Sequence, residues 1–344
     1  AREMAEALAS VMAGAGFRPR PRPAFLRIAL PAFLGAAAVY ALLALGVPGK
    51  IAALLGLGGR PEARHITIFA PTVLGDSQSD RVLAAGLAEH LRLRVDILAS
   101  HARRPDSFVI AGSTLQDYEV REAADASRFL GANVVVSGTL KRDGDNLVLR
   151  LEVVDTAKFA RLTTLSKSDH IANLATWQED IVLEVAAACG LEPSAGDRAI
   201  VASGGTTVPG AFESYLRGLG YLSGPLTAAN ADGAILCLEE AVARDPSFPA
   251  AGAGLAEAYW TKNLVAKDGP AAEKAEAQAR AVLKMNEKLA EGHLVLGWIC
   301  SGTGREREAV KEFERATEID PSMYEAFKRL GDVYEDLNEP AKAE

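Results

Sequence analysis

Two short stretches carry enough closely spaced oxygen atoms to raise the question of a cation site. The first is GDSQSD at 75–80 and the second is RDGDN at 142–146. A calcium-binding loop also needs a central glycine and a distant glutamate, and the first stretch lacks both. Asp76, Ser77 and Ser79 are therefore interpreted as capping residues at the start of a helix. The second stretch is interpreted as the solvated tip of a β-hairpin.

Other residues that commonly bind metals or act as nucleophiles are scattered along the chain. The five histidines have no ligand spacing, and Cys189, Cys237 and Cys300 do not form a Cys-x-x-Cys pair. The sequence also lacks a phosphate-binding Gly-x-x-x-x-Gly-Lys loop, kinase motifs and a Gly-x-Ser-x-Gly elbow. We expect no catalytic, cofactor or metal site in these 344 residues, so this segment is not predicted to be an enzyme.

The chain contains one apolar run that is long enough to cross a membrane. The 22 residues from Ile28 to Gly49 are uncharged, and a helix of about 20 apolar residues spans the hydrocarbon core. Arg18, Arg20, Arg22 and Arg27 precede the run, and such residues stay on the cytoplasmic side. We therefore predict a single-pass anchor at 24–48, with the amino end cytoplasmic and residues after about 50 extracytoplasmic. A cleaved signal peptide is the competing interpretation.

The charge is distributed unevenly along the chain. Residues 1–60 carry a net charge of +5, which leaves −13 on the remainder of a chain whose total is −8. An acidic remainder argues against nucleic acid as a partner. The predicted partners are the lipid bilayer, through 24–48, and a protein or peptide. The small residues of GAAAVYALLALG are suited to helix–helix contact, so a homodimer through the span stays open.

From His65 onward the pattern predicts alternating strands and helices. The expected strands are HITIFAP at 65–71, VDILAS at 95–100, two runs flanking the hairpin tip at 143–146, and ARLTTLSKS at 160–168. Helices are expected at 81–93, 118–131 and 171–191, with Gly131 ending the second. The last carries a stripe of five apolar residues, namely Ile171, Leu174, Trp177, Ile181 and Val185.

This order over residues 64–192 resembles the TolB amino-terminal-like (FlgO-related) domain of bacterial envelope proteins. The resemblance is carried by the helix with LAAGLAEHL, by LGANVVVSGTLKRDGDNLVLRLEVVDT and by the closing WQEDIVLEVAAACGL. It implies an α/β (α+β) domain. HARRPDSFVIAGSTLQ at 101–116 is longer and more basic than the family pattern.

The last third of the chain is periodic. Leu296-Gly297 recurs 34 residues later as Leu330-Gly331, and Ala309 recurs as Ala343. These positions resemble the tetratricopeptide repeat, which implies an all-α solenoid of helix pairs. Its signature residues in this chain are Leu255, Tyr259, Leu296, Gly297, Ala309, Phe313, Ala316, Pro321, Leu330, Gly331 and Tyr334. Seven extra residues in one unit are assigned to a loop, NLVAKDGP at 263–270.

The resemblance also implies a partner-binding face. Such arrays present a concave surface formed by the first helix of each pair, where peptides or partner segments bind. By their place in the repeat, the residues expected to line it are Glu257, Trp260, Trp298, Lys328, Asp332 and Glu335.

The order of parts resembles the back half of a bacterial signalling receptor. AREMAEALASVM at the start resembles the last helix of a bacterial serine/threonine protein kinase domain. The resemblance implies an extracytoplasmic (periplasmic) sensor or scaffold module of such a kinase, anchored through 24–48 in a bacterial inner membrane. The same module also occurs behind winged-helix regulators and adenylate cyclases, and a stand-alone envelope scaffold is a further alternative. The sequence starts without a methionine, and the repeats stop without a polar cap, so both ends are expected to be cuts through a larger protein.

The predicted organisation is thus multi-domain. Its parts are a cytoplasmic stub and basic stretch at 1–23, the span at 24–48, a linker at 49–63, the α/β domain at 64–192, a flexible linker at 193–210 and about three and a half repeats at 211–344.

Overall fold

The computed structural model describes residues 63–102, 106–194, 201–202 and 204–338. Among these residues, no helix combines the length and the apolar character that crossing a bilayer requires. The predicted span at 24–48 and the segments around it lie outside the described residues.

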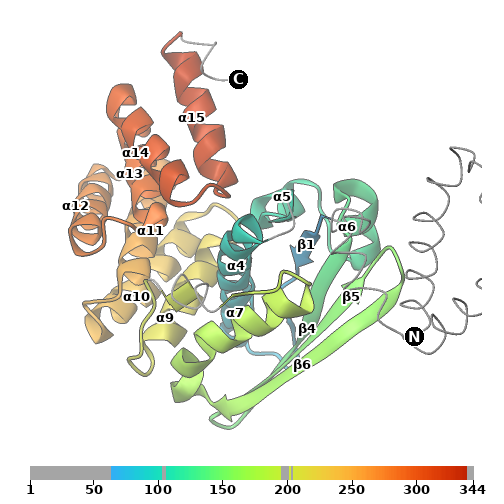
Figure 1. Cartoon of the computed structure of the whole chain (residues 1–344). Helices are drawn as coiled ribbons and strands as arrows, with labels where there is room; N and C mark the ends of the chain where they lie inside the picture. Colours follow the sequence, from blue (N-terminus) through green and yellow to red (C-terminus); the bar gives the residue numbers. More distant parts are fainter. Residues whose placement is uncertain (1–62, 103–105, 195–200, 203, 339–344) are drawn as a thin grey trace, which may run out of the picture. The chain divides into compact units, whose positions relative to one another are not determined.

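A mixed β-sheet forms the first part of the described chain (Figure 1). Its strands are β1 (His65–Ile68), β2 (Thr72–Val73), β3 (Phe108–Val109), β4 (Val134–Asp143), β5 (Asn146–Asp155) and β6 (Ala160–His170). The order is β3-β1-β4-β5-β6, and β2 pairs with β4. Strands β3, β1 and β4 run parallel, whereas β4, β5 and β6 are antiparallel. The hairpin predicted at 143–146 is confirmed, because Asp143 pairs with Asn146 across its turn.

Helix α4 (Gln78–His101) corrects the prediction of a strand at 95–100. The helix begins as expected, because the Ser77 side chain accepts a hydrogen bond from the Asp80 amide at 3.2 Å. Its buried residues Leu91, Val95 and Leu98 are spaced for one helical face. The residues predicted as a strand continue this face, and a short apolar run does not distinguish helix from strand by itself.

The segment at 101–116, which is longer than the family pattern, also has regular structure in its described residues. It contains β3 and the short helix α5 (Gly112–Asp117). The next helix, α6 (Ala123–Leu130), is shorter than predicted but ends at Gly131, whose φ of 67° is left-handed as a C-cap requires. The helix predicted at 171–191 divides into a 3₁₀ turn (Ile171–Thr176) and α7 (Trp177–Ala188).

Among the described residues, helices α9 to α15 form the last part of the chain (Figure 1). They form three pairs and a final single helix, namely α9 (Ala211–Leu222) with α10 (Ala228–Arg244), α11 (Pro249–Ala266) with α12 (Gly269–Met285), α13 (Ala290–Gly302) with α14 (Glu306–Ile319), and α15 (Tyr324–Asp336). Within a pair, a glycine of the first helix lies against a large residue of the second. Gly297 faces Phe313, and Gly218 faces Leu238.

The pairs are joined by turns of one repeated design. Asp245 and Asp320 each accept hydrogen bonds from the backbone amide and the hydroxyl of the serine two residues later, and Asn286 accepts from the Lys288 amide. The sequence shows this repetition as Asp-Pro-Ser at 245–247 and 320–322. A side chain that bonds its own backbone two residues on stabilises a turn after the helix ends.

The extra residues of the middle pair do not form the loop predicted at 263–270. Helix α11 continues to Ala266, and α12 begins at Gly269, so most of the insertion lengthens the two helices. Lys267, with a φ of 54°, and Asp268 make the turn between them.

The described part of the predicted linker at 193–210 is packed against both neighbouring regions. The Gln178 amide donates to the Thr206 carbonyl at 2.5 Å, and the Thr206 hydroxyl donates to Asp245 at 2.5 Å. One hydrophobic core runs from the sheet through α4 into the first helices of the array, with Ile66 and Leu91 on one side and Phe212 and Leu255 on the other.

Candidate functional site

The surface of interest is the inner face of the helical array, formed by α9, α11, α13 and α15. We define the inner positions as the second, fifth and ninth residues of each of these helices. They are Phe212, Tyr215 and Leu219 in α9, Ala250, Ala253 and Glu257 in α11, Glu291, Leu294 and Trp298 in α13, and Glu325, Lys328 and Asp332 in α15. The chemistry of this face therefore changes from apolar to charged along the array.

Helix α4 covers the inner positions of α9. Phe212, Tyr215 and Leu219 are all buried in the core that α4 shares with the sheet. The His90 ring of α4 lies edge-on to Phe212 at 5.1 Å and to Tyr215 at 6.1 Å between ring centroids. Burial lowers the pKa of His90 to about 3, so its imidazole is neutral at physiological pH and packs as an aromatic residue.

Two glycines set the distance between α4 and α9. A Cβ on Gly86 would overlap the carbonyl oxygen of Leu216, and one on Gly220 would overlap the carbonyl oxygen of Val82. The two backbones are therefore in direct contact where the helices cross, and only glycine leaves room there.

Beyond α9, α4 continues along the other inner helices. Arg94, of which only 5% is exposed, forms an ion pair with Glu291 of α13 at 3.5 Å. Burial raises the pKa of Asp96 to about 6, and the nearby charge of Asp320, in the turn before α15, adds to the rise. Helix α4 thus reaches from the first repeat to the start of α15. The sheet-containing part of the chain, from β1 to α7 and called the sheet domain below, supplies a helix to the array.

A shielded carboxyl group lies in the middle of this face. Burial raises the pKa of Glu257 to about 7, and the carboxylates of Glu89 on α4 and Glu325 on α15 raise it further. Glu257 is therefore largely protonated below neutral pH, because an additional charge among carboxylates away from water is unfavourable.

The structure separates the six residues predicted to bind a partner. Trp260 is buried and packs where Gly302 has no side chain, so it belongs to the core between α11 and α13 and does not line a groove. Glu257 is the shielded carboxyl group near Glu89 and Glu325. Trp298 is half-buried, and its indole nitrogen has no hydrogen-bond partner among the described residues. The other three, Lys328, Asp332 and Glu335, are exposed on α15.

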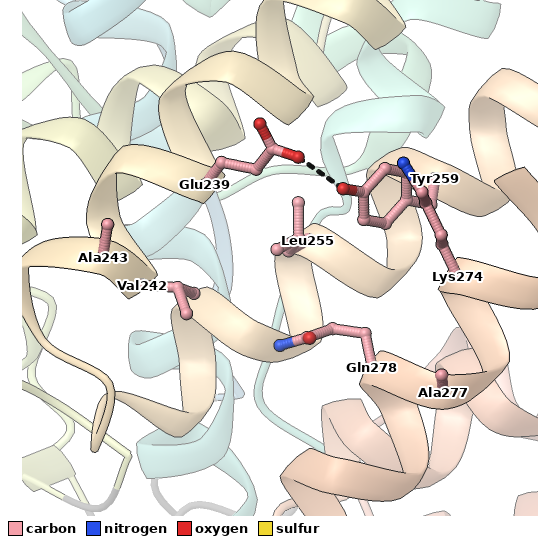
Figure 2. Close-up of a pocket in the computed structure, with 8 residues that line it drawn as sticks. All are labelled: Glu239, Val242, Ala243, Leu255, Tyr259, Lys274, Ala277 and Gln278. Atoms are coloured by element: carbon pink, nitrogen blue, oxygen red, sulfur yellow. Dashed lines mark hydrogen bonds between the residues drawn. The ribbon is translucent and has the colours of Figure 1, made fainter.

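Apart from the inner face, a hollow of about 460 Å³ lies between α10, α11 and α12 (Figure 2). The Tyr259 hydroxyl donates a hydrogen bond to Glu239 at 2.5 Å. Figure 2 shows this bond as a dashed line, with Lys274 beside the tyrosine ring. The Lys274 ammonium is 5.3 Å from the ring centroid. Burial and the Glu239 carboxylate raise the pKa of Tyr259 to about 12.

The hydrogen bond in this hollow recurs elsewhere in the array. Tyr334 donates to Glu314 at 2.9 Å, and both pairs are separated by 20 residues. The bond therefore joins the second helix of one repeat to the first helix of the next. Sequence reasoning marked both tyrosines as signature residues but missed their glutamate partners, which the equal spacing would have revealed.

The oxygen-rich stretch at 75–80 has structural contacts. Besides the Ser77 cap, Asp80 accepts two hydrogen bonds from the guanidinium of Arg142, at 2.8 and 2.6 Å, which ties α4 to β4. Across the part of the chain that the structure describes, no three His, Cys, Asp or Glu side chains are placed to hold a metal ion.

Comparison with known proteins identifies one repeat within the helical region. Residues 290–323 match the family described as tetratricopeptide repeat, over α13, α14 and the turn that follows. None of the curated proteins matches the chain.

Several solved tetratricopeptide structures are similar to the chain. The first such domain of human RPAP3 is 21% identical, covers 38% of this chain and 94% of its own, and has a TM-score of 0.32. The first such domain of Spaghetti (RPAP3), bound to the HSP90 peptide SRMEEVD, is 23% identical. It covers 37% of this chain and 93% of its own, with a TM-score of 0.31. A thermophilic tetratricopeptide protein of Thermus thermophilus is 18% identical. It covers 49% of this chain and 80% of its own, with a TM-score of 0.35.

Proposed function

We propose that the chain is a scaffold module that binds a protein partner on the inner face of its array. The match of residues 290–323 to the tetratricopeptide repeat is the observation that carries this proposal. Arrays of stacked helix pairs offer an extended concave surface for binding.

The partner surface is the part of the inner face formed by α13 and α15. It consists of Trp298, Lys328, Asp332 and Glu335, with one indole and charges of both signs. Because α4 fills the inner positions of α9, a partner that enters there would have to displace core residues. A peptide with complementary charges and an apolar residue for Trp298 suits the open part.

This surface is tested by reversing its charges. The double variant Lys328→Glu and Asp332→Lys should lose at least tenfold in affinity for a captured partner, and its melting temperature should stay unchanged. The matched control reverses the exposed Lys284 and Glu273 of α12 and should bind as the parent does. Equal capture by both double variants would contradict the assignment of this face.

We further propose that the module is the extracytoplasmic part of a membrane-anchored bacterial serine/threonine kinase receptor, with a TolB amino-terminal-like domain before the array. The uncharged run at 28–49 and the arginines before it support this location. A winged-helix regulator, an adenylate cyclase and a stand-alone scaffold are the alternatives. Kinase loops encoded upstream of Ala1 would favour the kinase receptor. An upstream winged helix or cyclase core would favour the corresponding alternative.

The orientation is tested with a reporter that is active only outside the cytoplasm, fused after Glu344. We expect activity from the parent and none after deletion of residues 24–48. Activity from a reporter that works only in the cytoplasm would refute the proposed orientation.

A further inference from the structure

A pocket of about 570 Å³ lies where the parallel strands end. Its wall includes Phe69 and Ala70, just after β1, and Gly112, just after β3. Strand β1 lies between β3 and β4. The chain passes from β1 through α4 to β3, and then through α5 and α6 to β4 on the other side of β1. Open sheets with this change of direction tend to bind ligands at the carboxyl ends of their strands.

Both parts of the molecule enclose this pocket. Leu115 and Gln116 of α5 line it from the sheet domain, and Ser223, Gly224 and Pro225, between α9 and α10, line it from the array. The Gln116 amide donates to the Ser223 carbonyl at 2.5 Å, which fixes the two walls to each other. The volume is in the range of small-molecule sites, about 300–1,000 Å³.

One arginine of the pocket is already occupied by internal contacts. The Arg92 side chain donates through Nε to the Ile68 carbonyl at 3.0 Å and forms an ion pair with Glu89. Gly112 leaves room for this pair, because a Cβ there would lie 2.8 Å from Arg92 Nη1. Arg92 therefore contributes no free charge to a ligand.

Two other charged residues of the pocket have no such contacts. Within the described ranges, neither the Glu119 nor the Arg121 side chain has an ion-pair or hydrogen-bond partner. They flank Val120, which is buried, and their Cα atoms are at most about 7 Å apart, because a single residue separates them. The pocket thus presents one carboxylate, one guanidinium and an apolar wall between them.

The backbone at Glu119 forms the turn that ends α5. Its φ of 51° lies in the left-handed region, which glycine adopts most readily. The turn is closed by hydrogen bonds from the Glu119 amide to the Gln116 carbonyl at 3.0 Å and from the Val120 amide to the Leu115 carbonyl at 2.8 Å. These are the hydrogen bonds of a Schellman motif, which ends α5 and in which glycine is the usual residue at this position. The turn itself therefore gives no reason for a glutamate here.

We propose that this pocket binds a small zwitterion of the α-amino-acid type. The ligand carboxylate pairs with Arg121, its ammonium pairs with Glu119, and an apolar side chain packs against Leu115, Val120 and Phe69. Bidentate pairing with arginine is the strong way to hold a carboxylate. This site goes beyond the proposed scaffold role and does not depend on it.

The test is calorimetric titration of the full chain with L-leucine and with two analogues that each lack one charge, 4-methylpentanoate and isopentylamine. We expect L-leucine to bind and each analogue to bind at least tenfold more weakly. Failure of L-leucine to bind would overturn the proposal. Equal binding of 4-methylpentanoate would also overturn it, because the site would then recognise an anion only.

Two variants separate a binding role from a structural one. Arg121→Ala and Glu119→Gly should each weaken L-leucine binding at least tenfold, while Glu119→Gly should keep or raise the melting temperature by relieving the left-handed backbone. The neighbouring Glu122→Gln is the matched control and should bind as the parent does. Unchanged binding in both variants would contradict the assignment. Partner capture through α15 is measured separately, so either proposal can fail alone.

Discussion

The first and last helices of the array use the same inner positions for opposite purposes. In α9 these positions hold Phe212, Tyr215 and Leu219, which are buried against α4. The equivalent residues of α15, Glu325, Lys328 and Asp332, are charged, and the last two are exposed. The repeat signature therefore determines how helices pair, whereas the inner positions determine whether a repeat is part of the core or faces a partner.

The middle helices show how one face changes into the other. Glu291 of α13 meets Arg94 of α4, and Glu257 of α11 lies near Glu89 of α4 and Glu325 of α15. Polar groups of the array thus face polar groups of α4 where its coverage becomes partial. The sheet domain acts as the amino-terminal cap of the solenoid, because it protects the apolar side of the first repeat.

The largest expected effect tests this comparison by alanine substitution at one inner position, the fifth residue, of α9 and of α15. Tyr215→Ala should reduce the free energy of unfolding by about 3–5 kcal/mol, as expected when a buried aromatic ring leaves a cavity. Lys328→Ala should change it by less than about 0.5 kcal/mol. Urea unfolding measures both. Similar losses at the two positions would contradict the difference between the ends.

A smaller effect concerns the pH dependence of the middle of the face. The folded-state pKa of Glu257 is about 7, against an ordinary value of 4.5. Between these values the unfolded chain has lost a proton that the folded chain retains, so this residue makes the free energy of unfolding fall as the pH rises from about 4.5 to 7. Glu257→Gln should remove that fall and be about 2–3 kcal/mol more stable than the parent at pH 8.

The control for this prediction is Glu335→Gln on α15, where the carboxylate is exposed. Its stability curve should follow that of the parent between pH 4 and 8, whereas the curve of Glu257→Gln should separate from the parent above about pH 5. Parallel curves for all three proteins would show that Glu257 ionises normally.

Much of the fold could be predicted because it depends on local patterns. The 34-residue recurrence of Leu296-Gly297 and of Ala309 identified the repeated helices, and Asp-Gly at 143–144 identified the hairpin. The strand at 95–100 was predicted wrongly because Val95 and Leu98 satisfy a short apolar run as well as a helical face. The insertion near Lys267 was placed in a loop because sequence spacing does not show whether extra residues lengthen a helix.

The partner-binding face was predicted less well because its covering comes from elsewhere in the chain. Trp260 was assigned by its repeat position, but packing against Gly302 depends on the following repeat. The cover over α9 did leave a signal. Phe212, Tyr215 and Leu219 are apolar where a free inner face would be polar, and Gly86 interrupts an otherwise strong helical sequence. Neither the sequence of α4 nor that of α9 alone shows which helix covers the inner positions of α9.

The central claim is that α4 makes the sheet domain and the array one cooperative unit. The chain has three tryptophans, so variants that retain only Trp177, in α7, or only Trp260, in α11, report on the two parts separately by fluorescence. Gly86→Ala, which forces α4 and α9 apart, should destabilise both reporters equally, by about 2 kcal/mol. Gly269→Ala, where nothing lies within 4 Å of the added carbon, should leave both unchanged. We predict that the two tryptophans report the same urea midpoint and that Gly86→Ala lowers both midpoints equally. A midpoint that falls for Trp177 while that for Trp260 stays constant would contradict the account.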